Sequence, residues 1–473
     1  MLFNSYEFIF LFLPITFFVY FYLLNKRLIT GAKGFLVFSS LFFYSWWNIA
    51  YLPLILGSML FNYIIGSSLN ENSSKIKFSK KSVLAFGISA NLLLLGYFKY
   101  YDFFITGVNT LLGSDIELLH LLLPLAISFF TFQQIAYLVD SYRGETKEYD
   151  FLNYAIFVTF FPQLIAGPIV HHKEMMPQFA SKFNLVKKHK NIALGLFIFS
   201  IGLFKKVIIA DNLAIMATNG FASSAALNTA EAWIASLSYT LQLYFDFSGY
   251  TDMAIGIALL FNIKLPINFN TPYKSTNIKE FWRRWHITLS RFLRDYIYIP
   301  LGGNRVSSAR IYSNLMITFI LGGLWHGAGL TFLFWGFLHG AALVIHRAWQ
   351  NTGIKLNKFV AWFITFNFIN ISWVFFKASE FDQALNILKA MFIYKEINTT
   401  IHRIEHILSH LSADDKTASI FIFAFIASIF FKNSIELMRG FKPNYRYMIF
   451  ILTIALASLL EMHQVTEFLY FNF

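Results

Sequence analysis

The sequence contains no cysteine and few charged residues. The absence of cysteine excludes disulfides, thiolate zinc sites, iron–sulfur clusters and cysteine nucleophiles. Charged residues make up 13% of the 473 residues, against about 25% in an ordinary soluble domain. Hydrophobic residues reach 57%, and phenylalanine alone contributes 58 residues. Since a soluble protein of this size would lack the polar side chains to cover its surface, the composition predicts a polytopic membrane protein. It excludes a disordered chain and a disulfide-rich secreted scaffold.

Acidic residues are scarcer than basic ones, 25 against 38, which gives a net charge of +13. In a membrane protein, basic residues accumulate in cytoplasmic loops. They are not interleaved here with exposed aromatic residues on a polar face, as a nucleic-acid surface would require. We therefore attribute the excess to topology and expect no nucleic-acid partner. Lys187–Lys190 and Lys205–Lys206 resist a strict alternation of loops between the two sides of the membrane.

Apolar stretches recur along the whole chain without a long polar region between them. This pattern predicts an all-α fold in which residues 1–473 form one transmembrane domain. A full span needs about 20 apolar residues, so several stretches are short, tilted or re-entrant, and we expect about 11 to 13 helices. The stretches are Ile9–Leu24, Phe35–Trp47, Tyr51–Ile65, Val83–Tyr97, Leu118–Val139, Phe151–Ala166, Ile192–Ala210, Trp233–Phe261, Ile311–Leu324, Leu330–Ile345, Val360–Phe376, Ser419–Phe431 and Met448–Leu460.

Residues 262–310 are unusually basic and carry nine of the 38 lysines and arginines. Between Phe281 and Tyr296, aromatic and leucine side chains recur at helical spacing, with arginines on the remaining face. The pattern predicts an amphipathic helix at the cytoplasmic membrane surface. Interfacial anchoring is the ordinary role of such a helix. The alternative is docking of an anionic donor, because guanidinium groups bind phosphate in a bidentate manner. The candidate donor-binding residues are Arg283, Arg284, Arg291, Arg294 and Trp325.

One histidine stands out among the 12 in the chain. His326 lies in Leu321–Gly329, which reads Leu-Gly-Gly-Leu-Trp-His-Gly-Ala-Gly, and the four glycines allow close approach of backbone or substrate. A desolvated imidazole stays neutral and can accept a proton from an attacking hydroxyl. A hydrogen bond between helices is the alternative role. For His286 and His339, packing or a helix–helix hydrogen bond is the expected role.

Other polar residues supply weaker candidates. Asp140, Asp246 and Asp252 lie at or within apolar stretches, where a carboxylate could orient a histidine, pair with an arginine or cap a broken helix. His402–His406 matches the H-x-x-E-H pattern of zinc proteases, but it sits in a short polar loop, so we expect a solvated turn and no metal. The chain contains no Gly-x-Ser-x-Gly or Walker motif, which argues against a serine hydrolase or an ATPase.

Several motifs together resemble the membrane-bound O-acyltransferases. The likeness is to the bacterial branch that serves alginate O-acetylation, peptidoglycan O-acetylation and teichoic-acid D-alanylation, and it covers essentially the whole chain. The matching stretches are Ser128–Gln133, Asp140–Gly144, Phe161–Ile169, Tyr244–Ala254, Asn268–Tyr273, Phe281–Arg305 and Trp325–Gly327.

The resemblance implies a fold and a chemistry. It implies a ring of transmembrane helices in the bacterial inner membrane, with a funnel from each side meeting near a catalytic histidine. That histidine is His326, and His286 is its partner. The donor is an acyl thioester, acetyl-CoA or an acyl carrier protein, and no cofactor or metal is bound. The resemblance also implies a separate extracytoplasmic SGNH-type transferase as a partner.

The C-terminal residues 468–473 resemble the aromatic motif of the polysaccharide-acylating branch, in which the tyrosine, here Tyr470, holds the acyl group transiently. A phenol with a pKa near 10 forms a reactive ester. Interfacial anchoring is the alternative role for Tyr470.

Together these observations predict an O-acetyltransferase that passes acetyl groups outward to an envelope polysaccharide, either peptidoglycan or an alginate-like glycan. A transporter or flippase whose buried histidine and aspartate residues bind ions or protons is the alternative. A structural scaffold for a partner enzyme is a third possibility. Dependence of acetyl transfer on His326 separates these classes.

Overall fold

Helices are the only regular secondary structure in the part of the chain that the computed structural model describes, namely residues 1–70, 78–146, 150–223, 227–393, 411–462 and 469. Six of these helical stretches are long and apolar enough to cross a membrane. The predicted all-α membrane fold is confirmed. The six stretches are Glu7–Asn25, Ile49–Leu69, Lys80–Leu112, His189–Ala222, Leu330–Gln350 and Lys358–Lys377.

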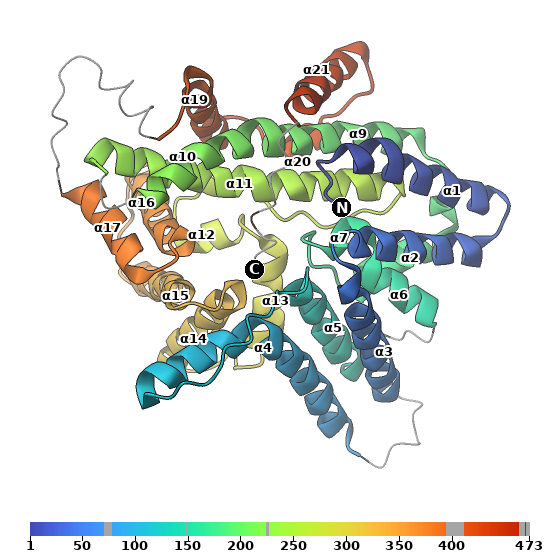
Figure 1. Ribbon diagram of the computed structural model, residues 1–473, viewed down its shortest axis with the longest axis horizontal. Coiled ribbons are helices and arrows are strands. Elements are labelled where there is room, and N and C mark those ends of the chain that lie inside the picture. The colour runs from blue at the N-terminus through green and yellow to red at the C-terminus, as the bar shows by residue number, and fades with distance from the viewer. Residues whose placement is uncertain (71–77, 147–149, 224–226, 394–410, 463–468, 470–473) are drawn as a thin grey trace.

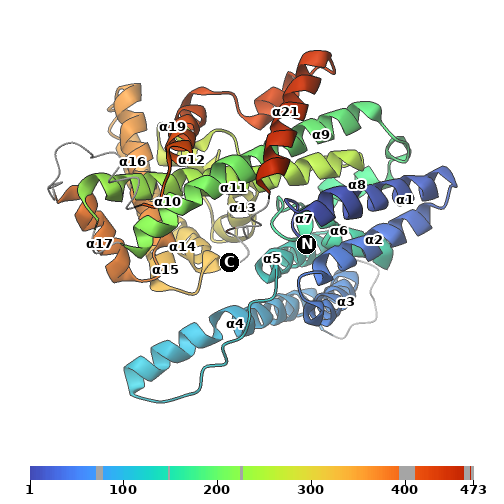
Figure 2. The same ribbon diagram turned by 45° about the horizontal axis from the view of Figure 1, so that its top comes forward.

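The helices form a ring around a short central pair (Figure 1). The central pair is α12 (Ile278–Trp282) and α13 (Ile287–Leu293). The long edge of the ring contains α9 (His189–Phe204), α10 (Asp211–Ala222) and α11 (Thr229–Leu260), covered on the outside by α19 (Asp415–Phe430), α20 (Ser434–Arg439) and α21 (Tyr445–Glu461). One end contains α14 (Ser308–His326), α15 (Leu330–Gln350), α16 (Lys358–Lys377) and α17 (Phe381–Phe392). The other end contains α1 (Leu13–Asn25), α2 (Ile29–Ser45), α3 (Leu52–Leu69), α5 (Ile127–Tyr142), α6 (Phe151–Thr159), α7 (Phe161–Leu164) and α8 (His172–Ala180). Figure 2 shows α4 (Lys80–Leu112) projecting beyond the other helices.

The predicted single amphipathic helix between Phe281 and Tyr296 is wrong. The helix breaks at His286, whose backbone is left-handed with φ 43°. At the break, the N–H of Ile287 donates to the carbonyl of Asn268 at 3.0 Å, so an extended segment replaces helical hydrogen bonds. The aromatic side chains of the region are buried among the ring helices instead of facing lipid. The segment therefore belongs to the protein core, because its aromatic side chains find protein partners in the centre of the ring.

Several other predicted boundaries differ from the structure for local reasons. The helix expected from Leu118 begins only at Ile127, because Pro124 and the left-handed Ala126 precede it. The stretch expected to end at Ala210 continues through a π-helical turn into α10, which ends at Ala222. Residues 151–166 form two helices, since Phe160 and Pro162 interrupt them.

A tight hairpin of α14 and α15 positions His326. At Gly323, a Cβ atom would lie 2.3 Å from the carbonyl oxygen of Phe332, and at Gly336 it would lie 2.4 Å from the carbonyl oxygen of Phe319. Since Cβ atoms do not approach backbone so closely, glycine at both positions lets the two helices touch. The backbone contact sets the position of the end of α14.

The substitution Gly323→Ala is therefore expected to destabilise the protein by about 1–3 kcal/mol, because the added methyl group pushes α15 away. The matched substitution Gly329→Ala should have little effect, since its Cβ would meet its nearest neighbour at 3.5 Å. Thermal unfolding of the purified variants in detergent measures both. Equal melting temperatures for the two variants would contradict the close-contact interpretation.

Candidate active site

His326 is the last residue of α14 and is only 2% exposed. Its imidazole lies among the rings of Trp325, Trp335 and Phe376, at centroid distances of 4.9, 5.1 and 5.1 Å. These rings come from α14, α15 and α16. The histidine thus lies in an aromatic enclosure where three helices meet.

His286 is also fully buried, and its position depends on the break between α12 and α13. Its Nδ1 lies 3.2 Å from Oδ1 of Asn268. The same oxygen accepts hydrogen bonds from the backbone N–H and the hydroxyl of Thr288, at 3.1 and 3.0 Å. A backbone N–H can only donate, so this atom of Asn268 is the carbonyl oxygen and Nδ1 of His286 carries the proton. In the neutral ring, Nε2 is then the nitrogen that accepts a proton.

The two histidines meet at Trp325. The ring of Trp325 lies 4.9 Å from the ring of His326 and 6.2 Å from the ring of His286. Trp325 itself is buried and stacks on Phe132 of α5 at 5.2 Å. The structure therefore brings together three residues singled out in the sequence, and it places Trp325 in the wall between the histidines.

Lys99 of α4 is a further member of this site and was not among the residues predicted from the sequence. Its Nζ donates to the carbonyl oxygens of Trp325 and His326, at 2.5 and 3.3 Å, and lies 3.3 Å from Oγ of Ser128. The neighbouring Tyr100 donates to the carbonyl of Leu324 at 2.6 Å. A cation is favourable at a helix C-terminus, where carbonyl groups lack intrahelical partners. Lys99 thus fixes the end of α14 that carries His326. A lysine following a long apolar run was the signal that could have identified it.

We expect Lys99→Met to lower acyl transfer by about tenfold to a hundredfold, because loss of the amine lets the terminal turn of α14 shift. Lys99→Arg should retain part of the activity, since a guanidinium can still donate to these carbonyls. The test is the rate of acetyl transfer by purified protein, with Lys80→Met at the exposed start of α4 as the control. Unchanged transfer by Lys99→Met would contradict a positioning role.

A cavity of about 260 Å³ borders the same peptide. Lys99 and Asp102 of α4 line it, together with Gly327 and Ala328 directly after His326. Its walls include both charged and apolar side chains, as is usual for ligand sites. The cavity thus reaches the two residues that directly follow His326.

His339 has the role that was expected for it, a hydrogen bond between helices. Its Nδ1 accepts from Nε1 of Trp282 at 3.2 Å, and its Nε2 lies 3.1 Å from Oγ of Ser372. These partners lie on α12 and α16, while His339 lies on α15. Both ring nitrogens are thus used in packing.

Two of the four candidate donor-binding arginines are partly buried and form ion pairs. Arg284 pairs with Glu280 at 2.9 Å, and Arg291 pairs with Glu174 of α8 at 2.5 Å. Burial alone would raise the pKa of the Glu280 carboxyl, but hydrogen bonds from Thr276 and the nearby Arg284 outweigh it and hold that pKa below its usual value. These guanidinium groups therefore brace the central segment.

The other two candidate arginines, Arg283 and Arg294, are exposed. Arg294 pairs with its neighbour Asp295 at 2.7 Å. Arg283 and Arg294 are consequently the two candidates best placed to meet a ligand from outside the protein.

Asp140 belongs to a separate buried polar cluster. Its Oδ1 accepts a hydrogen bond from the hydroxyl of Tyr296 at 2.7 Å, and its Oδ2 lies 3.4 Å from Nδ1 of His171. The Tyr296 hydroxyl also lies 3.0 Å from that nitrogen. The cluster joins the end of α5 to the segment that follows α13. Asp140 thus orients a histidine, as one of its expected roles required, but the histidine is His171.

Asp246 and Asp252 of α11 pair with lysines, whereas the expected roles were to orient a histidine, to pair with an arginine or to cap a broken helix. Lys206 lies 2.8 Å from Asp246, and Lys205 lies 2.7 Å from Asp252. Asp246 makes a further contact, because its Oδ2 accepts a hydrogen bond from the backbone N–H of Leu469 at 3.0 Å. These buried ion pairs join the π-helical turn after α9 to α11.

Tyr470 and the His402–His406 pattern lie outside the described residues. Within the described ranges, no group of three or more histidine, aspartate or glutamate side chains is arranged to hold a metal ion.

A ring of membrane helices that encloses a buried histidine defines the class of protein, and comparison with known proteins identifies the family. Residues 140–379 match the model of the membrane-bound O-acyltransferase (MBOAT) family. The peptidoglycan O-acetyltransferase of Helicobacter pylori is 48% identical over 517 aligned residues, which cover 100% of this chain and 98% of the relative. The chain belongs to the membrane-bound O-acyltransferase family.

Other relatives have different acceptors in their names. The probable alginate O-acetylase AlgI of Pseudomonas aeruginosa is 42% identical over 400 residues, covering 83% of this chain and 75% of the relative. The teichoic acid D-alanyltransferase of Streptococcus thermophilus is 29% identical over 280 residues, which cover 53% of this chain and 68% of the relative. The protein is thus a multi-pass membrane acyltransferase, consistent with the inner membrane of a bacterium.

Proposed function

We propose that the protein takes acetyl groups from a cytosolic thioester and passes them across the inner membrane for O-acetylation of an extracytoplasmic polysaccharide. The observation that carries the proposal is the position of His326, buried where α14, α15 and α16 meet, with His286 on the same tryptophan. Among peptidoglycan and alginate-like glycans, peptidoglycan is the preferred acceptor, because the relative of that name aligns with the whole chain at 48% identity.

In this mechanism His326 is the general base. Its imidazole accepts the proton of an acceptor hydroxyl, whose oxygen attacks the carbonyl carbon of the thioester. The carbon–sulfur bond then breaks, and the departing thiolate takes the proton from the imidazolium. The products are an ester and a free thiol. Transfer of the acetyl group alone avoids moving a charged donor through hydrocarbon, which would be costly.

Acetyl-CoA is the proposed donor, and an acyl carrier protein is the alternative thioester. Arg283 and Arg294 are exposed and can meet its phosphates, whereas Arg284 and Arg291 hold the surrounding segment through their ion pairs. No resident cofactor is required for this reaction, because the donor is a substrate.

Tyr470 is the proposed first acceptor of the acetyl group. Support comes from the likeness of residues 468–473 to the C-terminal aromatic motif of the polysaccharide-acylating branch. A phenyl ester is more reactive than an alkyl ester, since the phenol has a pKa near 10. A separate SGNH-type transferase outside the membrane then moves the acetyl group to the glycan.

Tyr470→Phe is expected to abolish acetyl label on the protein and to reduce glycan acetylation to background, because the ring without its hydroxyl forms no ester. The measurement is mass spectrometry of the purified protein after incubation with acetyl-CoA. Tyr447→Phe, which removes a hydroxyl bonded to the carbonyl of Gly440, is the control. Acetyl label that persists in Tyr470→Phe would overturn the carrier role. The acetyl group would then be transferred to a hydroxyl other than that of Tyr470.

The whole proposal is tested with the protein reconstituted in vesicles and supplied with radiolabelled acetyl-CoA on one side. We expect label on the protein or on a hydroxyl acceptor. If no thioester donor gives labelled product with the wild-type protein, the O-acetyltransferase proposal fails.

A further inference from the structure

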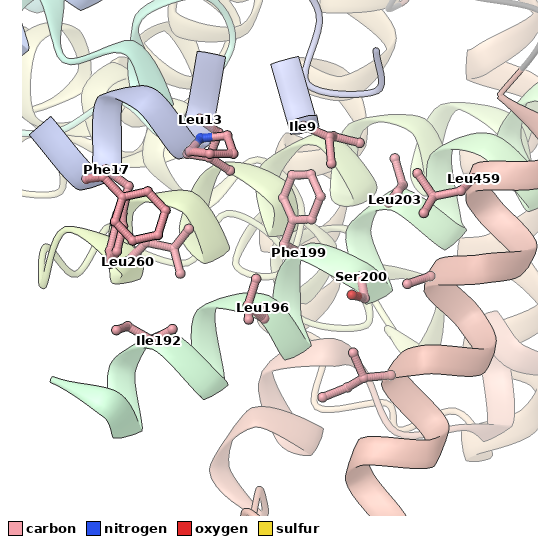
Figure 3. A pocket seen from close by; sticks show the side chains of 14 residues that line it. Ile9, Leu13, Phe17, Ile192, Leu196, Phe199, Ser200, Leu203, Leu260 and Leu459 are labelled. Atoms are coloured by element: carbon pink, nitrogen blue, oxygen red, sulfur yellow. The ribbon is translucent and has the colours of Figure 1, made fainter. Parts of the chain in front are cut away.

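An apolar groove lies between α1, α9 and α21, and no histidine is among the residues that line it (Figure 3). Its volume is about 400 Å³. Figure 3 shows Leu196 and Phe199 of α9 along its floor, Leu13 on the side of α1 and Leu459 on the side of α21. Its single polar side chain is that of Ser200. In a membrane protein, such a groove is accessible to lipid.

The two ends of the groove differ. At one end, the hydroxyl of Tyr6 donates to the carbonyl of Leu459 at 2.6 Å and ties the start of the first span to α21. At the other end, Nζ of Lys187 lies 5.9 and 5.5 Å from the ring centroids of Phe17 and Phe18, both of which line the groove. Lys187 is exposed, and within the described residues it forms no ion pair. A hydrogen bond thus closes one end of the groove. The other end carries Lys187, which has no ion-pair partner among the described residues.

The length of the groove corresponds to one membrane leaflet. Its floor runs along α9 from Ile192 to Leu203. At ~1.5 Å per residue this is about 16 Å, close to half of the ~30 Å hydrocarbon core. A continuous partner helix is a poorer occupant, because the hydrogen bond between Tyr6 and Leu459 closes one end of the groove.

We infer that this groove is a binding site for an anionic phospholipid, with an acyl chain along α9 between α1 and α21 and the headgroup phosphate beside Lys187. The apolar walls supply affinity for the chain, and the lysine supplies selectivity for a negatively charged headgroup. The site fills the space between the first span and the last described helix, so the lipid packs these two parts of the ring together.

The test is native mass spectrometry of the full-length protein in detergent with equal amounts of phosphatidylglycerol and phosphatidylcholine. We expect the wild type to retain phosphatidylglycerol in preference. Lys187→Met should reduce this preference about fivefold, because one interfacial lysine contributes that much to anionic lipid binding. Ala455→Trp, which fills the groove from α21, should abolish retention of both lipids, and Leu196→Trp repeats this from α9.

Two matched variants serve as controls. Lys355→Met removes an exposed lysine between α15 and α16. Ala341→Trp fills a different apolar groove between α14 and α15. The inference is overturned if wild type retains both lipids equally, if Lys187→Met behaves as Lys355→Met does, or if both groove-filling variants retain lipid as Ala341→Trp does.

Discussion

Replacing His326 by glutamine is expected to lower the rate of acetyl transfer by about 10²–10⁴-fold, the usual contribution of a general base. Glutamine fills similar space and keeps a hydrogen-bonding end group, so the aromatic enclosure of Trp325, Trp335 and Phe376 stays packed. It cannot take up a proton near neutral pH. The loss should therefore appear as a lower rate of the chemical step, with donor binding little changed.

The rate is measured by transfer of radiolabel from acetyl-CoA to the protein and to a hydroxyl acceptor. His346→Gln, farther along α15 and only partly buried, is the control and should transfer normally. His339→Gln should differ from both, because that ring is bonded at both nitrogens and its loss acts on stability. Wild-type transfer by a correctly folded His326→Gln protein would exclude His326 as the base.

The glycines on both sides of His326 predicted close approach of backbone or substrate, and the contact between Gly323 and the backbone of Phe332 confirms close approach of backbone. The sequence could not predict the neighbours of that histidine. Lys99 lies just beyond the apolar stretch Val83–Tyr97 and was not among the predicted site residues. The long α4 carries it into the site, where it bonds to the carbonyls of Trp325 and His326. Contacts between residues more than 200 positions apart depend on how the ring closes.

The same limit applied to Lys205 and Lys206. They resisted a strict alternation of loops between the two sides of the membrane, although they lie within the stretch Ile192–Ala210, which was expected to be a span. In the structure they lie in a π-helical turn within one continuous helix, and each pairs with a buried aspartate of α11. The apolar composition around them correctly predicted a membrane helix. The partners of the charges became visible only when α9 and α11 were placed side by side.

The central segment shows how tertiary contacts override periodicity. The spacing of Trp282, Trp285 and Phe292 correctly predicted which side chains share an apolar environment, since all are buried. It wrongly predicted one helix, because a helical pattern does not reveal that Asn268 bonds to His286 and Thr288 and breaks it.

Lys205→Met is expected to lower the free energy of unfolding by about 3–5 kcal/mol, the usual cost of removing one partner of a buried ion pair. Nζ of Lys205 bonds to Oδ2 of Asp252 at 2.7 Å, and Ser434 donates to Oδ1 of the same carboxylate at 2.8 Å. Without the lysine, the negative charge of Asp252 stays buried. Of these two contacts, only the hydrogen bond from the neutral hydroxyl of Ser434 remains. The pair also links the turn after α9 to α11 and α20, so its loss weakens the long edge of the ring.

The double variant Lys205→Met/Asp252→Leu should recover most of this stability, because it removes both charges and leaves apolar side chains of similar length. Reversible unfolding in mixed detergent micelles, followed by tryptophan fluorescence, measures both variants. Lys416→Met breaks an exposed pair with Glu461 and should cost about 1 kcal/mol or less. If the double variant is as unstable as Lys205→Met, the attraction between the two charges, and not the desolvation of an unpaired carboxylate, is what stabilises this edge.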